Sequence, residues 1–487
     1  FSVVVLFLCA GILTPKEMLE GFSNKGMITV ALLFLVSEGI RQSGTLGQVI
    51  KKLLPQGKTT VFKAQLRILP SVAFISAFLN NTPVVVIFAP IIKHWAKSVN
   101  LPATKFLIPL SYVTILGGIC TLIGTSTNLV VHGMILEAGF EGFSMFELGK
   151  VGIFIAIAGI IYIFLFSKRL LPDARPDTAV PDEEVEEGEK LHRVEAVLGA
   201  RFPGINKKLK DFNFQRHYGA EVKEIKTRNG QRFVSNLEDV VLHEGDTLVV
   251  MADDTFIPTW GESSVFVLLT NGNEPDTTGK KKRWFALLLL VLMIVGATVG
   301  ELPVTKEMFP DIKLDMFFFV SITTIIMAWT NLFPARKYTK YISWDILITI
   351  ACAFAISKAM VNSGVADSVA KFIIGLSDDY GPHVLLAMVF IITNLFTELI
   401  TNNAAAALAF PLALSISAQL GVSPTPFFVV ICMAASASFS TPIGYQTNLI
   451  VQGIGNYKFT DFVRIGLPLN IITFLISIIL IPLIWNF

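Results

Sequence analysis

Apolar residues form long runs along most of this chain, and the runs are of two kinds. Some continue for close to the about 20 residues that a helix needs to cross a bilayer, and others are interrupted by a few polar residues. A chain dominated by such runs is predicted to be an α-helical polytopic membrane protein. The uninterrupted runs are 147–170, 284–300, 314–333, 341–361 and 459–486, and a shorter run covers 27–40.

Two interrupted stretches consist of a pair of apolar arms around two neighbouring asparagines. The arms of the first pair are too short to cross a bilayer alone, so we expect a re-entrant hairpin with its polar tip near the midplane. The second pair has the same order of arm, tip and arm and is interpreted in the same way. The first hairpin is predicted within 68–98 around Asn80 and Asn81, and the second from 384–400 and 404–418 around Asn402 and Asn403.

Two longer apolar stretches, 105–138 and 424–455, are each broken by nearly the same polar motif. The first motif reads TLIGTSTN and the second reads TPIGYQTN, with Gly124 and Gly444 at equivalent places. Glycine relaxes the backbone where a helix must unwind. Each stretch is therefore predicted to be a discontinuous helix, broken at 121–127 and at 441–447.

Hairpin, discontinuous helix and spanning helix follow one another in the same order in both halves. Matched polar breaks of this kind are typical of secondary transporters that are built from two structural repeats. We expect one repeat in 1–171 and the other in 284–487, with an amphipathic stretch at 364–377 before the second hairpin. Phe1–Leu13 is too short to span, and we interpret it as the second half of a helix that begins upstream.

The Lys and Arg residues of the short loops predict the orientation. Loops 41–67, 93–105, 334–342 and 453–464 carry 6, 3, 3 and 2 Lys and Arg residues, whereas the loops on the other side carry 2, 1, 2 and 1, mixed with acidic residues, which assigns the first set to the cytoplasm. The first hairpin then enters from the inside and the second from the outside. The two repeats are therefore expected to be inverted, with the C-terminus outside.

Residues 172–283 have a different composition. An acidic stretch at 181–190 is expected to be a mobile linker, and short alternating segments at 220–226, 231–234 and 247–251 predict strands. We expect a small α/β domain with its core at about 191–270. Lys and Arg residues on both sides of it place this insert in the cytoplasm.

Composition agrees with a membrane protein and argues against several other classes. Of the 487 residues, 53% are hydrophobic and 16% are charged, with a mean hydropathy of +0.64; soluble domains have about 25% charged residues. The net charge of +2 gives no indication of nucleic-acid binding, and the four cysteines are scattered singly. The chain has no nucleotide-binding loop, metal motif or nucleophile constellation, so we expect no enzymatic activity.

The two tips and the two broken-helix motifs together resemble the divalent anion–sodium symporter family, which includes dicarboxylate, citrate and sulfate carriers. The stretch KLKDFNFQRHYGAEVKEIKTRNG followed by HEGDTLVVM is similar to a TrkA C-terminal domain, which a bacterial branch of the family carries as an insert. The resemblance implies a bacterial inner membrane, a homodimer and a small cytosolic ligand on the insert. The family tip is Ser-Asn-Thr; Asn81 and Asn402 match its asparagine, whereas Asn80 replaces the serine and Asn403 replaces the threonine.

The resemblance also implies which residues bind ions. One sodium ion is expected between Asn81 and the break at Gly124, and a second between Asn402 and the break at Gly444. Sodium is a hard cation that prefers oxygen ligands, as calcium and magnesium do. The anion is expected between the tips, where no Lys or Arg lies in the motifs, so sodium and helix N-termini must balance its charge. Its expected contacts are Asn80, Asn81, Thr82, Thr125, Thr401, Asn402, Asn403 and Gln446, with Ser126 as a further candidate.

Glu398 lies four residues before Asn402, in an apolar arm. A carboxylate at membrane depth costs about 2.5–3.5 kcal/mol on insertion scales, so it is a functional candidate. It could bind a cation, carry a proton or brace the hairpin, and Lys358 is a possible ion-pair partner.

The preferred interpretation is a sodium-coupled secondary transporter of a small divalent anion that works by an elevator-type shift. The larger tip residues, and the occurrence of TrkA-type inserts in sulfate carriers of the family, favour sulfate over a dicarboxylate. Two alternatives belong to other classes: an anion-sensing membrane receptor, and an ion channel gated through the insert. The chain lacks the TVGYG filter of potassium channels, and paired broken helices are more typical of carriers.

Overall fold

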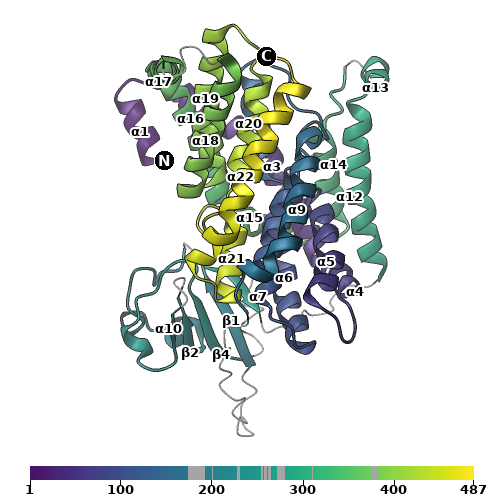
Figure 1. The fold of residues 1–487 in the computed structure, drawn as a ribbon, viewed down its shortest axis with the longest axis vertical. Coiled ribbons are helices and arrows are strands. Elements are labelled where there is room, and N and C mark those ends of the chain that lie inside the picture. The colour runs from purple at the N-terminus through teal and green to yellow at the C-terminus, as the bar shows by residue number, and fades with distance from the viewer. Residues whose placement is uncertain are drawn as a thin grey trace.

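The computed structural model describes residues 1–173, 192–199, 201–227, 231–253, 256, 260, 265–270, 280–309, 311–375 and 381–487. The predicted acidic linker 181–190 and the last residues of the amphipathic stretch 364–377 lie outside these ranges. The described part is a helical body with a small β-sheet at one end, and Figure 1 shows the C-terminus at the opposite end from the sheet.

The first half of the helical body contains both of the interrupted elements expected there. A hairpin of α5 and α6 is followed by α7 and α8, which are separated by an irregular segment at 119–125 that we call the first break. α9 then runs back along the body toward the sheet. The helices are α1 (Ser2–Cys9), α2 (Pro15–Glu20), α3 (Lys25–Gln42), α4 (Thr45–Leu53), α5 (Val61–Ser76), α6 (Asn81–Ser98), α7 (Thr104–Gly118), α8 (Ser126–Glu137) and α9 (Gly149–Leu170).

The second half has a hairpin of α18 and α19, then α20 and α21 around a second break at 437–445, and then the long helix α22. The helices are α12 (Lys280–Gly300), α13 (Pro303–Met308), α14 (Met316–Trp329), α15 (Tyr338–Tyr341), α16 (Trp344–Asn362), α17 (Val365–Gly375), α18 (Gly381–Leu399), α19 (Asn402–Leu420), α20 (Thr425–Ser436), α21 (Gln446–Gly455) and α22 (Phe459–Ile484).

Six helices in the described ranges are long and apolar enough to cross a membrane, or seven if the bent pair formed by α16 and α17 is one span. Their outward faces carry large apolar side chains such as Phe154, Leu292 and Leu475, which are about half exposed. Apolar residues on both the inner and the outer face of a helix are expected where lipid replaces water. These features identify the helical body as a polytopic membrane protein.

The sheet contains five strands in the order β3-β2-β4-β1-β5, and every described pair is antiparallel. The domain is therefore better described as α+β than as the α/β domain that the sequence suggested. β2, β3 and β4 lie at the predicted strands, whereas β1 and β5 were not predicted. The elements are β1 (His192–Leu198), α10 (Phe214–Tyr218), β2 (Glu221–Lys226), β3 (Arg232–Phe233), β4 (Thr247–Ala252) and β5 (Phe266–Thr270).

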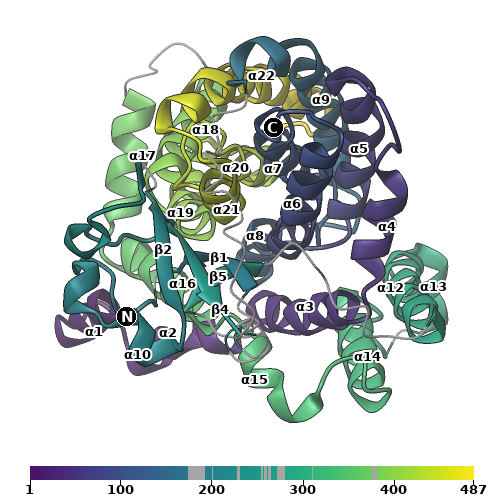
Figure 2. The same ribbon diagram turned by 90° about the horizontal axis from the view of Figure 1, so that it is seen from below.

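Close backbone contacts bring α9 and α22 against the two breaks. A Cβ atom on Gly152 of α9 would lie 2.7 Å from the carbonyl oxygen of Ile119, and one on Gly466 of α22 would lie 2.0 Å from that of Phe439. Only glycine permits an approach this close. Figure 2 shows α7, α20 and α21 near the middle of the helical body, with α9 and α22 along its edge.

Candidate functional site

The first hairpin places Asn81 in the interior. α5 ends at Ser76, and Asn81 begins α6 and is fully buried. The Ser76 hydroxyl donates a hydrogen bond to Asn81 Oδ1 at 2.7 Å, and Asn81 Nδ2 donates to the Tyr445 hydroxyl at 2.5 Å. Both ends of the amide are thus held, and the second partner belongs to the other half of the chain.

The first break is held against this hairpin by Thr121. Its hydroxyl donates to the carbonyl oxygen of Ala77 and accepts from the Gly124 amide at 3.2 Å, while Asn128 Nδ2 donates to the Thr121 carbonyl at 2.9 Å. The backbone groups of an unwound segment need such partners inside a membrane. The motif residues Thr121, Gly124 and Asn128 therefore fix the geometry of the break.

The second break has the same connections. The Thr441 hydroxyl donates to the carbonyl oxygen of Glu398 at 3.1 Å and accepts from the Gly444 amide at 3.2 Å. Asn448 Nδ2 donates to the Thr441 carbonyl at 3.1 Å and to the Ser438 carbonyl at 2.8 Å. Ala77 and Glu398, which accept the two threonine hydroxyls, therefore occupy equivalent places in the two halves.

Hydrogen bonds between the halves bring the tips and the breaks together. The Tyr445 hydroxyl is 2.9 Å from Thr125 Oγ1, and Thr82 Oγ1 donates to Gln446 Oε1 at 3.2 Å. On the other side, Ser126 Oγ donates to Asn403 Oδ1 at 3.2 Å. Each hairpin tip therefore contacts the break of the opposite half.

Four helices begin at these tips and breaks: α6, α8, α19 and α21. None of their N-cap residues, which are Asn80, Thr125, Thr401 and Tyr445, makes a side-chain capping hydrogen bond. The first-turn amides of a helix have no partner within the helix and attract anions. The four helix N-termini are therefore available to bind a negatively charged group.

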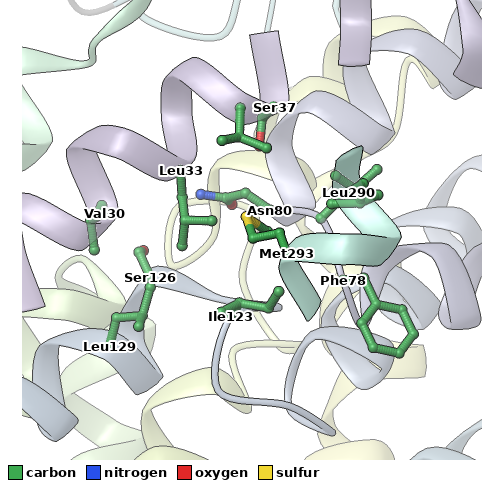
Figure 3. Close-up of a pocket in the computed structure, with 12 residues that line it drawn as sticks. Val30, Leu33, Ser37, Phe78, Asn80, Ile123, Ser126, Leu129, Leu290 and Met293 are labelled. Atoms are coloured by element: carbon green, nitrogen blue, oxygen red, sulfur yellow. The ribbon is translucent and has the colours of Figure 1, made fainter. Parts of the chain in front are cut away.

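The predicted site residues do not all lie in this network. Asn80 is half-buried and lines a separate pocket between α3, α12 and the first break, together with Ser126, as Figure 3 shows. Asn402 is buried, but its side chain makes no hydrogen bond among the described residues, and Thr401 is exposed. Tyr445 lies in the second break and contacts both the first tip and the first break. It was not predicted as a site residue, because the motif alone does not show what its hydroxyl contacts.

Glu398 is bound to the second break and to α22. Its Oε1 accepts from the Ser440 amide at 2.9 Å and from Asn470 Nδ2 at 2.7 Å. The proposed ion pair with Lys358 is not formed: Lys358 is exposed, and its charge acts on Glu17 and Glu137 instead. Glu38 is also buried in a helix, but it is fully paired with Arg41 at 2.6 Å and with Gln42 at 2.6 Å.

The insert contacts both halves of the helical body. Lys93 of α6 donates to both carboxylate oxygens of Glu195 on β1 at 3.0 Å, and Lys226 of β2 lies 3.4 Å from the same carboxylate. Burial raises the pKa of Glu195, but Lys93 and then Lys226 outweigh that effect and hold the pKa at about 2. On α21, a Cβ atom at Gly453 would lie 2.6 Å from Thr247 Oγ1 of β4. The sheet is thus fitted closely against α6 and α21.

The model of the citrate transporter family, CitMHS, matches residues 1–420 and 312–486. The chain belongs to this family. Membership makes the protein an integral membrane transporter rather than an enzyme. Of the predictions above, an anion-carrier family, a helical membrane protein and a transport function are thereby confirmed.

Curated relatives match almost the whole chain. An uncharacterised transporter of Synechocystis is 30% identical over 570 residues, which cover 99% of this chain and 93% of that protein. A Chlamydomonas reinhardtii protein with the provisional name "sulfur deprivation response regulator" is 28% identical over 98% of this chain and 96% of its own length. A second protein of that alga, named "Probable sodium/sulfate cotransporter 3", is 23% identical over 97% of this chain and 84% of its own length.

Proposed function

We propose that this member of the CitMHS family is a sodium-coupled secondary active transporter of a small divalent anion, with sulfate as the first candidate and a dicarboxylate as the second. The observation that carries the proposal is the convergence of four uncapped helix N-termini, two from each half, on one hydrogen-bonded set of tips and breaks. No Lys or Arg lies in these motifs. Bound sodium must therefore supply most of the positive charge that the anion needs, which couples the two ligands.

The two halves act as inverted repeats with re-entrant hairpins. Thr121 and Thr441 make the same three connections in their respective halves, to a hairpin carbonyl, to the motif glycine and to the motif asparagine. Inverted repeats with broken helices that meet at the bilayer midplane are the common plan of such carriers. The insert faces the cytoplasm of a bacterial inner membrane, and the C-terminus faces the outside.

One sodium ion binds between Asn81 and Gly124. A Cβ atom on Gly118 would lie 2.6 Å from Asn81 Oδ1, 3.1 Å from Asn81 Nδ2 and 3.1 Å from the Gly124 carbonyl oxygen, so the Asn81 amide and the Gly124 carbonyl border the same small space. A hard cation takes such oxygens as ligands. The second sodium ion binds between Asn402 and Gly444, by the symmetry of the repeats.

The anion binds between the two tips. Its ligands are the amide groups of the paired asparagines, the hydroxyl groups of Thr82, Thr125 and Thr401, and Gln446. Thr401 and Gln446 are exposed, so a solute can reach this part of the site. The cotransporter name of the algal relative supports sulfate as the first choice.

Transport proceeds by an elevator-type shift of the hairpins and broken helices as one unit. The hydrogen bonds between the halves support this mechanism, because they join all four elements to one another. α9 and α22 pack directly on the breaks and move with them, while α12 and α14 belong to the static scaffold through which two copies form a homodimer.

The insert is a TrkA-C-like regulatory domain with a small cytosolic ligand. A second candidate function, an anion-sensing receptor, is favoured by the name of the algal sulfur-response relative and by the docking of the sheet on α6 and α21. Uptake into proteoliposomes of labelled sulfate and labelled succinate, with and without a sodium gradient, tests the proposal. Gradient-driven accumulation of sulfate is expected; binding of sulfate without any accumulation would favour the receptor.

A further inference from the structure

Two buried oxygen atoms beside the second break have no hydrogen-bond partner among the described residues. They are Oε2 of Glu398 and Oδ1 of Asn470. The two side chains are joined through their other atoms, since Asn470 Nδ2 donates to Glu398 Oε1 at 2.7 Å and to Ser440 Oγ at 2.9 Å. Asn470 is only 6% exposed. The two side chains thus touch, and each has one buried oxygen that the described residues do not satisfy.

The first half of the chain shows that a break of this type does not require the pair. Ala77 is the counterpart of Glu398, because each accepts the hydroxyl of its own break threonine. Gly152 and Gly466 are counterparts that pack on equivalent residues of the two breaks, so Ala156 of α9 occupies the place of Asn470. The first break is therefore built with two alanines where the second has a glutamate and an asparagine.

A purely structural role of Glu398 and Asn470 does not explain why the first half has alanines at both places. In the first half, the Cys120 amide, the counterpart of the Ser440 amide, donates to the carbonyl oxygen of Gly117 at 3.0 Å. The backbone of the break can thus be satisfied without a carboxylate. Leaving a carboxylate oxygen unpaired in a buried place is costly, and each such group calls for a ligand or a function.

We propose that Glu398 and Asn470 form a third cation site, specific for sodium, in the second half only. The ligands are Glu398 Oε2 and Asn470 Oδ1, with the Ser440 hydroxyl at the edge of the site. A carboxylate and two neutral oxygens suit a hard monovalent cation. The ion neutralises the carboxylate at membrane depth and lies beside the second break, so it adds one positive charge to the unit that carries the anion. The proposal rests on the sodium coupling proposed above.

Sodium binding to the purified full-length protein tests this site without any need for transport. Equilibrium dialysis with labelled sodium gives the number of ions bound, with choline chloride holding the ionic strength constant. Glu398→Gln retains an acceptor for the Ser440 amide and for Asn470 Nδ2 but removes the charge. We expect this variant to bind one ion fewer, or one ion at least tenfold more weakly, with the remaining ions unchanged.

Asn470→Ala introduces the alanine that the first half has at this place and should lower the affinity for the same sodium ion. It is the variant to use if Glu398→Gln does not fold. Glu38→Gln is the matched control, because Glu38 is a buried helical carboxylate that is already paired with Arg41. Its sodium binding should equal that of the wild type.

Four results would overturn the proposal. An unchanged number and affinity of sodium ions in Glu398→Gln, with only a lower melting temperature, would make the pair a brace. Unchanged sodium binding together with loss of a pH dependence that the wild type shows would make Glu398 a proton carrier. A wild type that binds no sodium would reject both this site and sodium coupling, whereas binding that is lost only in Asn81→Ala and Asn402→Ala would reject this site alone.

Discussion

The side-chain amide of Asn81 donates a 2.5 Å hydrogen bond to the hydroxyl of Tyr445, which lies 364 residues later in the chain. This bond joins the tip of the first hairpin to the second break. Because the same tyrosine oxygen also contacts Thr125, one side chain connects three of the four motifs. The two halves therefore share one polar centre.

Replacing the central asparagines should remove sodium dependence. Asn81→Ala and Asn402→Ala each delete one oxygen ligand of a proposed sodium site, so sodium-dependent uptake should fall to background while expression is largely retained. The sodium dependence of uptake in proteoliposomes and of the melting temperature measures this. If both variants transport with unchanged sodium dependence, the sodium sites are assigned to the wrong residues.

Removing the Tyr445 hydroxyl should destabilise the polar centre that the two halves share. In Tyr445→Phe, the buried Asn81 amide loses its acceptor, which costs about 1–3 kcal/mol of stability. We expect a lower melting temperature and slower uptake. Tyr162→Phe is the control, because its hydroxyl donates to the carbonyl oxygen of Ile465 at 3.0 Å outside the centre. An equal loss of uptake in both variants would show that Tyr445 has no special role.

Deleting residues 175–280 should leave a folded carrier with an altered rate or altered control. The insert lies at one end of the helical body (Figure 1) and contributes none of the tips or breaks. Substrate binding by the purified deletion protein, compared with its uptake rate, tests this. Complete loss of substrate binding in a folded deletion protein would contradict a regulatory role.

The ion pair between Lys93 and Glu195 should hold the insert in place in a pH-dependent way. The pKa of Glu195 is about 2 in the folded protein and 4.5 ordinarily. A lowered pKa stabilises the ionised state, so its contribution is present above about pH 4.5 and is lost as the pH falls toward 2. The protection factors of the β1 amides, which correct for the intrinsic pH dependence of exchange, should therefore fall over this window.

Glu195→Gln should raise the exchange of β1 already at neutral pH, because it removes the charge that Lys93 and Lys226 share. Glu221→Gln serves as the control, since in the part of the chain that the structure describes Glu221 pairs with the exposed Lys223. If exchange of β1 is the same in the wild type and in Glu195→Gln, the ion pair does not hold the sheet.

A disulfide between the first tip and α12 should trap one state of the carrier. Asn80 and Met293 line the same pocket (Figure 3), so cysteines at both positions are expected to cross-link when Cys9, Cys120, Cys352 and Cys432 have been replaced. Uptake should stop on oxidation and return on reduction. Full uptake by the cross-linked protein would mean that the tip does not move relative to α12.

The sequence was most informative where a few residue types are needed for a backbone reason. Thr, Gly and Asn recur in both breaks because an unwound segment needs a hydroxyl, a small residue and an amide to satisfy its carbonyls and amides. Pattern alone therefore located both breaks and the turns between the hairpin arms. However, α18 and α19 are each long and apolar enough to cross a membrane, so the re-entrant course of the second hairpin stays a prediction. The bounds shifted by a few residues, as for α5, which starts at Val61 because the Thr60 hydroxyl accepts from the Lys63 amide.

Contacts between distant residues could not be predicted in this way. Asn470 lies in an apolar stretch whose periodicity is the same whether its side chain faces lipid or a partner, and Tyr445 lies in a polar motif that does not show which residue its hydroxyl contacts. Strand β1 was missed because His192 and Arg193 continue a charged stretch, and only its pairing with β4 and β5 shows it to be an interior strand of the sheet.

The position of the insert has a mechanical consequence. Its sheet touches α6 from one half and α21 from the other, through Glu195 and Thr247. If α6 and α21 move as one rigid body, the sheet can move with them and keep both of its contacts. If a gate opens between them, one contact must break. The distance between a fluorophore on the sheet and one on α6 or α21 would therefore report on the mechanism. It should stay constant if the helices move as a rigid body and should change if a gate opens locally.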